Sequence, residues 1–245
     1  YPLNPFEYKK RSTSKVINFG GTEVPRVLVS LCNISDVKRR KRLFLQVLLP
    51  QVLRLNEAIR ADRARLIAIG ETPVNDRTTE NAAWLDALAQ QYRTSPTDHK
   101  SLLSRVDVVP PSLAIAQGAI ESGWGTSRFA IAGNALFGQR TFDPNGAGFR
   151  PKGAEYANFK VRRFESLMRS TWGYMITLNT HTAHVGFRQL RAWMRQQDDT
   201  IDSIALAGKL TRYSEEGERY VTLVRNVIIT NNLRRLDDLQ LARSP

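Results

Sequence analysis

The residues with the clearest chemical potential are a glutamate and a tryptophan three positions apart, Glu121 and Trp124. The apolar residues of the stretch 115–120 recur at helical spacing, which predicts a short helix running up to Glu121, and Gly123 stands where a left-handed C-cap is expected. A carboxylate in the last turn of a helix faces the negative end of the helix dipole, and apolar neighbours remove water from it. We therefore expect a raised pKa for Glu121, as a general acid near neutral pH requires. The alternative is a solvated glutamate at a helix end, with Trp124 in the core.

The elements around this stretch are mostly helical. Pro111 at a first helical position predicts a firm start for the Glu121 helix, and residues 127–132 predict one more helical turn. The segment 138–161 is rich in Gly, Pro and Asn and predicts a small β-hairpin around the turn 143–146, with strands at 141–142 and 156–161. Helical patterns follow at 165–179, 186–197, 200–210 and 215–233.

The N-terminal part predicts an irregular arm followed by a long helix. Residues 1–35 contain several prolines and glycines, and Ser35-Asp36 can cap a helix over 37–69, in which Pro50 predicts a kink or a break. Five basic residues, 38–42, stand at its start. They indicate either an anchor for an anionic surface or a solvated helix face. Thr79 is expected to cap a helix over 80–92, and 100–106 predicts a short helical piece.

Composition limits the class of protein. The chain has 245 residues, of which 42% are hydrophobic, enough for a sizeable core. No apolar run approaches a membrane span, and no signal peptide is visible, so we expect a mature or trimmed form. The single cysteine excludes an intrachain disulfide, and His181 and His184 have no obvious third ligand and are interpreted as surface loop residues; we expect no metal and no cofactor. The net charge of +13 favours an anionic polymer as partner, but its even spread argues against nucleic acid.

Two stretches resemble one known family. The motif around Glu121 resembles that of the FlgJ/Bax-type glucosaminidases, peptidoglycan-cleaving family 73 glycoside hydrolases with a lysozyme-like fold. The matching positions are Ala116, Gln117, Ala119, Glu121, Ser122, Trp124, Gly125, Ser127, Asn134, Phe137 and Gly138, with one extra residue between Asn134 and Phe137. A second segment resembles the family's paired tyrosines at Tyr213 and Tyr220, again with one extra residue, and with Glu216 in place of an aspartate. The long basic helix, the run 136–139 and the run 179–181 are similar to the Bax-type branch.

The resemblance implies roles for named residues. Glu121 would be the general acid, and Tyr220 would lie across the cleft and orient Glu121, a water or the substrate's acetamido group. The residues expected to bind substrate are Ser122, Trp124, Asn134, Phe137, Phe142, Tyr156 and Tyr213; for Phe142 and Tyr156, core packing is an equal alternative. The candidates for a second acid are Glu155 and Asp143, although Asp143 in an Asp-Pro-Asn-Gly turn is better explained as a turn former. The substrate's own 2-acetamido group is an equally good alternative to a second carboxylate.

Together these features predict a mainly α (α+β) protein: a lysozyme-like helical domain with a small β-hairpin lobe. We expect an irregular arm at 1–34, a helical extension at 35–105, the catalytic domain at 106–236 and a tail at 237–245. The expected reaction is hydrolysis of the β-1,4 bond after N-acetylglucosamine in peptidoglycan glycan strands, in the bacterial periplasm or cell envelope. The alternatives are a muramidase or lytic transglycosylase on the same glycan, and a non-catalytic wall-binding or assembly protein.

Overall fold

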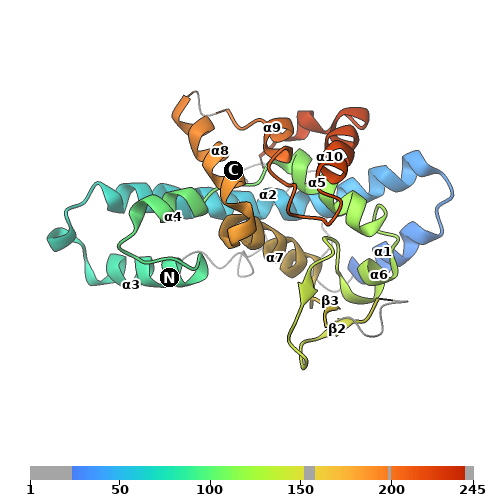
Figure 1. Ribbon diagram of the computed structural model, residues 1–245, viewed down its shortest axis with the longest axis horizontal. Helices are drawn as coiled ribbons and strands as arrows, with labels where there is room; N and C mark the ends of the chain where they lie inside the picture. The colour runs from blue at the N-terminus through green and yellow to red at the C-terminus, as the bar shows by residue number, and fades with distance from the viewer. Residues whose placement is uncertain (1–23, 152–157, 198–199, 241–245) are drawn as a thin grey trace, which may run out of the picture. The chain divides into compact units, whose positions relative to one another are not determined.

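The computed structural model describes residues 24–151, 158–197 and 200–240, which are mostly helical with one small antiparallel sheet (Figure 1). The described residues form two compact units. The first, which we call the Glu121 unit, takes its residues from Ser14–Val52 and Ala114–Tyr174. The second, the Tyr220 unit, takes them from Leu53–Leu113 and Met175–Pro245. This α+β composition confirms the predicted fold class, while the predicted domain boundaries stay predictions.

The Glu121 unit begins with a helix where an irregular arm was expected. Helix α1 spans Val24–Cys32, so the prediction was wrong for this part of the arm; residues 1–23 lie outside the described residues. Leu28 and Leu31, three positions apart and therefore on one helix face, are both fully buried. A methyl group added to Gly125 would touch both leucines, so α1 is held as a helix by packing against the turn that follows Glu121.

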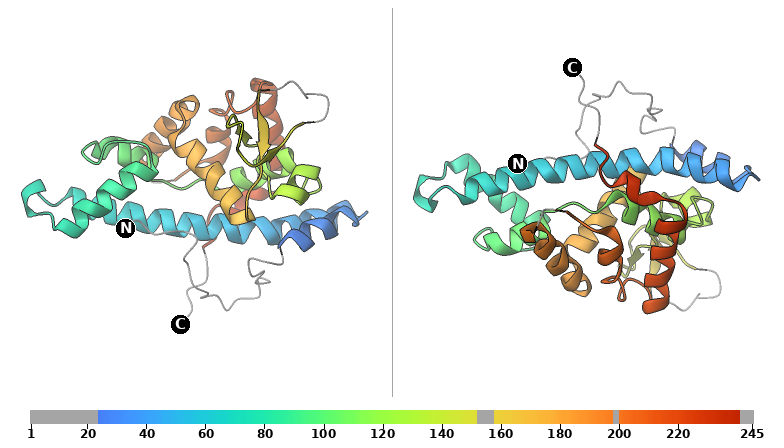
Figure 2. Two further views of the ribbon diagram at one scale, coloured as in Figure 1. Left: turned by 90° about the horizontal axis from the view of Figure 1, so that it is seen from below. Right: turned by 90° about the horizontal axis from the view of Figure 1, so that it is seen from above.

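Helix α2 spans Val37–Gly70 and is continuous through Pro50 (Figure 2), so the predicted break does not occur. A proline inside a helix costs about 3 kcal/mol because its ring removes one hydrogen bond and crowds the preceding turn. Leu48 and Val52 on either side of it are fully buried, and burial of each such side chain contributes about 1.5–3 kcal/mol. Packing of these neighbours therefore offsets the cost of the proline.

The sheet of the Glu121 unit contains the predicted pair of strands and one further strand that was not predicted. Strands β1 (Arg140–Thr141) and β2 (Gly148–Phe149) both pair antiparallel with β3 (Lys160–Arg162), and not with each other. The predicted turn is present, because the amide of Gly146 donates to the carbonyl of Asp143 at 3.0 Å. The central strand decides the order, since its buried Val161 packs with Ala135 and Phe164 in a small core. The remaining helices of the unit are α6 (Arg128–Gly133), part of α5 (Pro111–Ser122) and part of α7 (Leu167–Thr180).

The Tyr220 unit contains the helices that the sequence predicted after residue 79 and after residue 186, of which α9 and α10 are shorter than expected. The N-cap of α3 is Thr78 and not Thr79, because its hydroxyl accepts from the amide of Asn81 at 3.2 Å. Among the described residues none of the helices combines the length and apolar character needed to cross a membrane. The elements are α3 (Thr79–Gln91), α4 (His99–Arg105), α8 (Val185–Gln197), α9 (Ser203–Ala207) and α10 (Glu218–Thr230), with 3-10 turns η1 (Val74–Asp76), η2 (Thr182–His184) and η3 (Leu233–Leu236).

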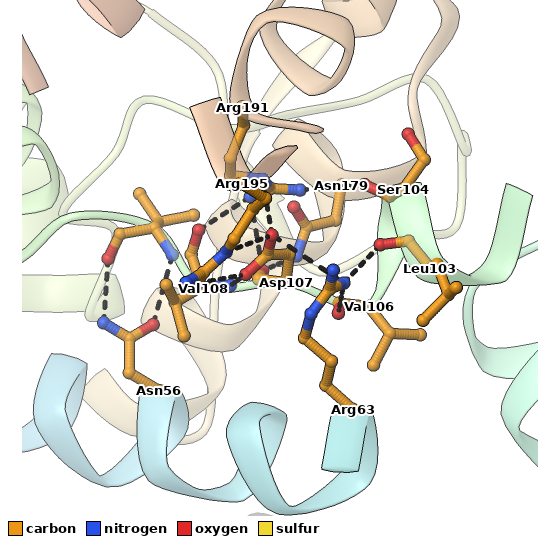
Figure 3. A network of polar contacts seen from close by, with 11 residues as sticks. Asn56, Arg63, Leu103, Ser104, Val106, Asp107, Val108, Asn179, Arg191 and Arg195 are labelled. Carbon is orange, nitrogen blue, oxygen red and sulfur yellow. Dashed lines mark hydrogen bonds and ion pairs between the residues drawn. The ribbon is translucent and has the colours of Figure 1, made fainter. Parts of the chain in front are cut away.

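A buried ion network holds the segment of this unit that leads into α5. Figure 3 shows Arg63 from α2 and Arg191 and Arg195 from α8 converging on Asp107, whose carboxylate is 2.8 Å from Arg195, 3.6 Å from Arg191 and 3.7 Å from Arg63. Burial alone would raise the pKa of Asp107, but the three arginines together lower it, so the carboxylate stays charged. Arg63 and Arg191 also donate to backbone carbonyls between residues 103 and 108, which fixes the path of this segment.

Candidate functional site

The turn after Glu121 is built by a complete helix C-cap. The amide of Trp124 donates to the carbonyl of Ala119 at 2.9 Å and the amide of Gly123 to that of Ile120 at 3.5 Å, the two bonds of a Schellman motif. Gly123 has a φ of +58°, which confirms the predicted left-handed cap. Two further residues, Trp124 at +57° and Gly125 at +81°, continue in the same region, so the chain reverses tightly after Glu121.

A buried serine side chain closes this turn from inside. The hydroxyl of Ser122 donates to the carbonyl of Gly118 at 2.5 Å and accepts from the amide of Gly125 at 2.8 Å. Ser122 is fully buried, so both its hydrogen bonds serve the backbone. The predicted contact of Ser122 with substrate is therefore replaced by a supporting role: it holds the turn on which Glu121 and Trp124 sit.

The carboxylate of Glu121, half-buried, lies directly over the backbone of Gly138. A Cβ atom built on Gly138 would be 2.5 Å from Glu121 Oε2, and Gly138 has a φ of +63°. Both facts require glycine: the conformation disfavours a side chain, and the space that a side chain would fill is taken by the carboxylate. The helix end and the loop before β1 thus meet at the acid.

A buried pair of aromatic rings, Phe137 and Tyr174, lies beneath the helix that carries Glu121 and is bonded to it through Gln117. Phe137 stacks on Tyr174 of α7, with ring centres 4.1 Å apart and planes 8° apart, and the Tyr174 hydroxyl donates to Gln117 Oε1 at 2.7 Å. Gln117 lies one turn before Glu121 on α5. Burial raises the pKa of Tyr174 well above its ordinary value and the charge of Glu121 raises it further, so this phenol remains a hydrogen-bond donor. Neither Gln117 nor Tyr174 was predicted to be a site residue. The presence of Gln117 in the motif was the one feature of the sequence that could have indicated this pair.

Comparison with known proteins agrees with this geometry. The glucosaminidase family, described as mannosyl-glycoprotein endo-beta-N-acetylglucosaminidase, matches residues 97–233, a range that contains Glu121, Gly138 and both tyrosines. The chain belongs to the glucosaminidase family. The family resemblance stated from the motifs is thereby confirmed, and membership of this family supports a glycoside hydrolase that acts on a glycan.

One relative and one absence complete the comparison. The chain is 33% identical over 187 residues to "Protein bax" of Escherichia coli (strain K12); the match covers 74% of this chain and 66% of that protein, slightly less than two thirds of its length. No solved structure matches this chain.

Two further residues that were predicted to contact substrate, Phe137 and Asn134, have buried side chains that contact other parts of the protein. Phe137 is 1% exposed and stacked on Tyr174, so it belongs to the core. Asn134 is buried at the left-handed C-cap of α6, and its side-chain amide donates to the carbonyl of Phe164 at 3.0 Å. The motif residues around Glu121 thus form the supports of the site more than its surface.

Trp124 contacts α2 of the same unit. It is half-buried, packs edge-on against Phe44 with ring centres 5.6 Å apart, and has the ammonium of Lys41 4.6 Å from the centre of its ring. The tryptophan on the turn after Glu121 is therefore contacted by an apolar and a basic side chain from the first turns of α2.

Among the described residues of the β lobe, one aromatic side chain is exposed. Phe142 is 65% exposed, with its ring centre 6.3 Å from that of Phe159. Asp143, one residue on, is exposed and its Oδ1 accepts from the amide of Asn145 at 2.9 Å, which confirms its predicted place in the turn. Glu155 and Tyr156, the other predicted residues of the lobe, lie outside the described residues.

The paired tyrosines belong to the Tyr220 unit and form a ring stack. Tyr213 and Tyr220 have ring centres 5.4 Å apart and planes 11° apart, and the ring of His184 is 5.9 Å from Tyr213. Tyr220 is 3% exposed. The expectation that Tyr220 faces Glu121 across a cleft stays a prediction.

His184 differs from its interpretation as a surface loop residue. It lies in the 3-10 turn η2 and is 3% exposed, because the turn folds it under Tyr213. Burial lowers its pKa to about 4, with the positive charges of His181, Arg188 and Arg212 as further causes, so the ring is neutral at physiological pH. No group of three metal-ligating side chains was found in the described part of the chain.

Proposed function

We propose that the chain is a peptidoglycan hydrolase, an endo-β-N-acetylglucosaminidase that cleaves the β-1,4 bond after N-acetylglucosamine. The observation that carries this proposal is the half-buried carboxylate of Glu121, seated on Gly138 at the end of α5 within the family-matched region. Membership of the family and the similarity to a bacterial protein support a glycan of the bacterial envelope as substrate.

In this proposal Glu121 protonates the leaving oxygen as the glycosidic bond breaks. A general acid must be held in a fixed position, because proton transfer requires its carboxyl group to lie within hydrogen-bond distance of the reacting oxygen. The cap at Gly123, the hydroxyl of Ser122 and the backbone of Gly138 supply that position.

The second role, stabilising the sugar cation or attacking it, has three candidates: Asp143, Glu155 and the substrate's own 2-acetamido group. Asp143 uses one carboxylate oxygen to hold its own turn, which favours the other routes. The substrate's 2-acetamido group can attack the anomeric carbon, and Glu155 is the remaining carboxylate of the lobe. Glu155→Gln separates them: large loss of turnover indicates a carboxylate mechanism, and near-normal turnover indicates substrate assistance.

We also propose that Tyr220 orients the acid, a water or the acetamido group by hydrogen bonding, with Tyr213 stacked on it, and that Phe142 and Trp124 contact sugar rings. For Tyr220 the test is Tyr220→Phe, which keeps the stack and removes only the hydroxyl. A fall in kcat with an unchanged melting temperature supports the proposal, and an unchanged kcat contradicts it.

The deciding experiment is digestion of purified sacculi by the wild type, Glu121→Gln and the control Glu165→Gln. Glu165 is exposed and forms an ion pair with Arg169 on the surface of the same unit, so its replacement removes the same charge. We expect clearing by the wild type and by the control, and none by Glu121→Gln at equal melting temperature. Clearing by Glu121→Gln would refute the assignment.

The released fragments decide which bond is cut. Reducing N-acetylglucosamine ends support the glucosaminidase, reducing muramic ends indicate a muramidase, and anhydro-muramic ends indicate a lytic transglycosylase. Pelleting of the wild type with sacculi, without release of soluble sugar, would make the chain a binding or assembly protein.

A further inference from the structure

The five basic residues at the start of α2 do not all point the same way. The helix is capped by Asp36, whose Oδ1 accepts from the amides of Lys38 at 2.8 Å and Arg39 at 3.3 Å. Arg40 turns back and donates to the carbonyl of Ile34 at 3.2 Å. At about 100° of rotation per residue, Lys38, Lys41 and Arg42 share one side of the helix, and Arg39 lies beyond its edge. We call Lys38, Lys41 and Arg42 the basic strip.

The basic strip begins at the catalytic turn. The ammonium of Lys41 is 4.6 Å from the centre of the Trp124 ring, a cation–π contact, and Trp124 is three residues from Glu121. The buried Phe44, one turn further along α2, packs edge-on against the same tryptophan ring. These contacts lie within one compact unit, so the strip has a defined place beside Trp124.

Protein stability does not account for these charges. A cation in the first turn of a helix, here Lys38, opposes the helix dipole at a cost of roughly 0.3–1 kcal/mol. Lys38 and Arg42 are exposed, and no ion pair of the described residues involves either of them. An anionic partner outside the chain would offset this cost.

We propose that the basic strip binds the carboxylate groups that project from the glycan strand held at Glu121, that is, those of the lactyl-peptide substituents of peptidoglycan. The inference rests on the proposed function. Charge complementarity supports it: the strip is cationic, the substituents are anionic, and Trp124 joins the strip to the turn that carries the acid. The strip thereby selects peptide-bearing glycan over neutral polymers of N-acetylglucosamine.

The test measures binding without catalysis, in a Glu121→Gln background. Pelleting with intact sacculi is compared with pelleting with sacculi whose carboxylates have been amidated by carbodiimide and methylamine. The variants are Lys38→Gln/Arg42→Gln, the single Arg42→Gln, and its matched control Arg163→Gln, which removes an equal exposed charge elsewhere in the same unit.

We expect the double variant to bind intact sacculi roughly five-fold more weakly at low salt, since each exposed ion pair contributes about 0.2–1 kcal/mol. The difference should vanish in about 0.5 M salt, where exposed charges are screened, and on amidated sacculi. Arg42→Gln should weaken binding and Arg163→Gln should not. Equal losses for these two, or an undiminished loss on amidated sacculi, would overturn the proposal.

Two further outcomes are distinguishable. If the double variant loses binding to vesicles of phosphatidylethanolamine and phosphatidylglycerol but binds sacculi normally, the strip faces a membrane and the proposal fails. If sacculi binding depends on the strip as expected but the wild type releases no sugar, the inference stands and the proposed hydrolysis fails.

Discussion

Replacing Gly138 with alanine tests whether the position of the Glu121 carboxylate matters for activity, because the substitution moves this group without removing it. The new Cβ would lie 2.5 Å from Glu121 Oε2, whereas ordinary contact begins near 3.4 Å, so the oxygen has to move by about 0.9 Å. The carboxylate is the far end of a flexible side chain, and its displacement is therefore cheap for folding. It is expensive for catalysis, because a misplacement of about 1 Å costs roughly 100-fold in rate.

The stability cost comes from the backbone instead. An alanine at a φ of +63° costs about 1–2 kcal/mol, which for a chain of this length lowers the melting temperature by roughly 2–8 °C. Gly123→Ala is the matched control, because its φ is +58° and its added Cβ would meet only Thr126 Oγ1, at 3.3 Å. We expect similar melting temperatures for the two variants and a far larger loss of activity for Gly138→Ala.

The assay is the initial rate of clearing of a sacculus suspension at a temperature at which both variants are folded. Equal rates of clearing by Gly138→Ala and Gly123→Ala would refute this prediction. The Glu121 carboxylate would then either tolerate the displacement or take no part in hydrolysis. A Gly138→Ala/Glu121→Gln double variant should be no worse than Glu121→Gln alone, because both changes act through the same group.

Three further variants test the supports of the fold. Asp107→Asn removes the partner of three arginines, and we expect a loss of about 3–5 kcal/mol in the free energy of unfolding, measured by urea titration; a loss below 1 kcal/mol would contradict the network. Ser122→Ala leaves the amide of Gly125 without its buried acceptor and should cost about 1–3 kcal/mol in the same measurement. His184 has a folded pKa of about 4, below its ordinary 6.5, so the unfolded state takes up the proton first and stability is lost as the pH falls from 6.5 towards 4. The wild type should therefore lose up to about 2 kcal/mol more than His184→Gln between pH 7 and pH 5, and parallel pH curves would contradict the burial of this ring.

Features that depend on a few neighbouring residues were predictable. The left-handed cap at Gly123, the start of α5 at Pro111 and the turn at Asp143 each arise from the conformational preferences of single residues and from bonds spanning five positions or fewer. The same is true of the motif that led to the family, because its residues build one continuous turn.

Features that depend on contacts between residues far apart in the sequence could not be predicted. Helix α1 packs through Leu28 and Leu31 against Gly125, almost a hundred residues away, and strand β2 adds to the predicted pair of β1 and β3 beside the buried Val161. Pro50 is tolerated for the same reason, since burial on either side exceeds its local cost. Local patterns contain none of these partners.

For the candidate site the division follows the same line. The sequence by itself determined which acid to consider, Glu121, and the shape of the turn that presents it, because both are encoded in contiguous residues. Only the tertiary structure decided that Phe137 and Ser122 are supports, that Tyr174 underlies the acid, and that Gly138 leaves room for its carboxylate. The physical reason is that burial and close contact are properties of pairs of segments, and the chain order does not state which segments will meet.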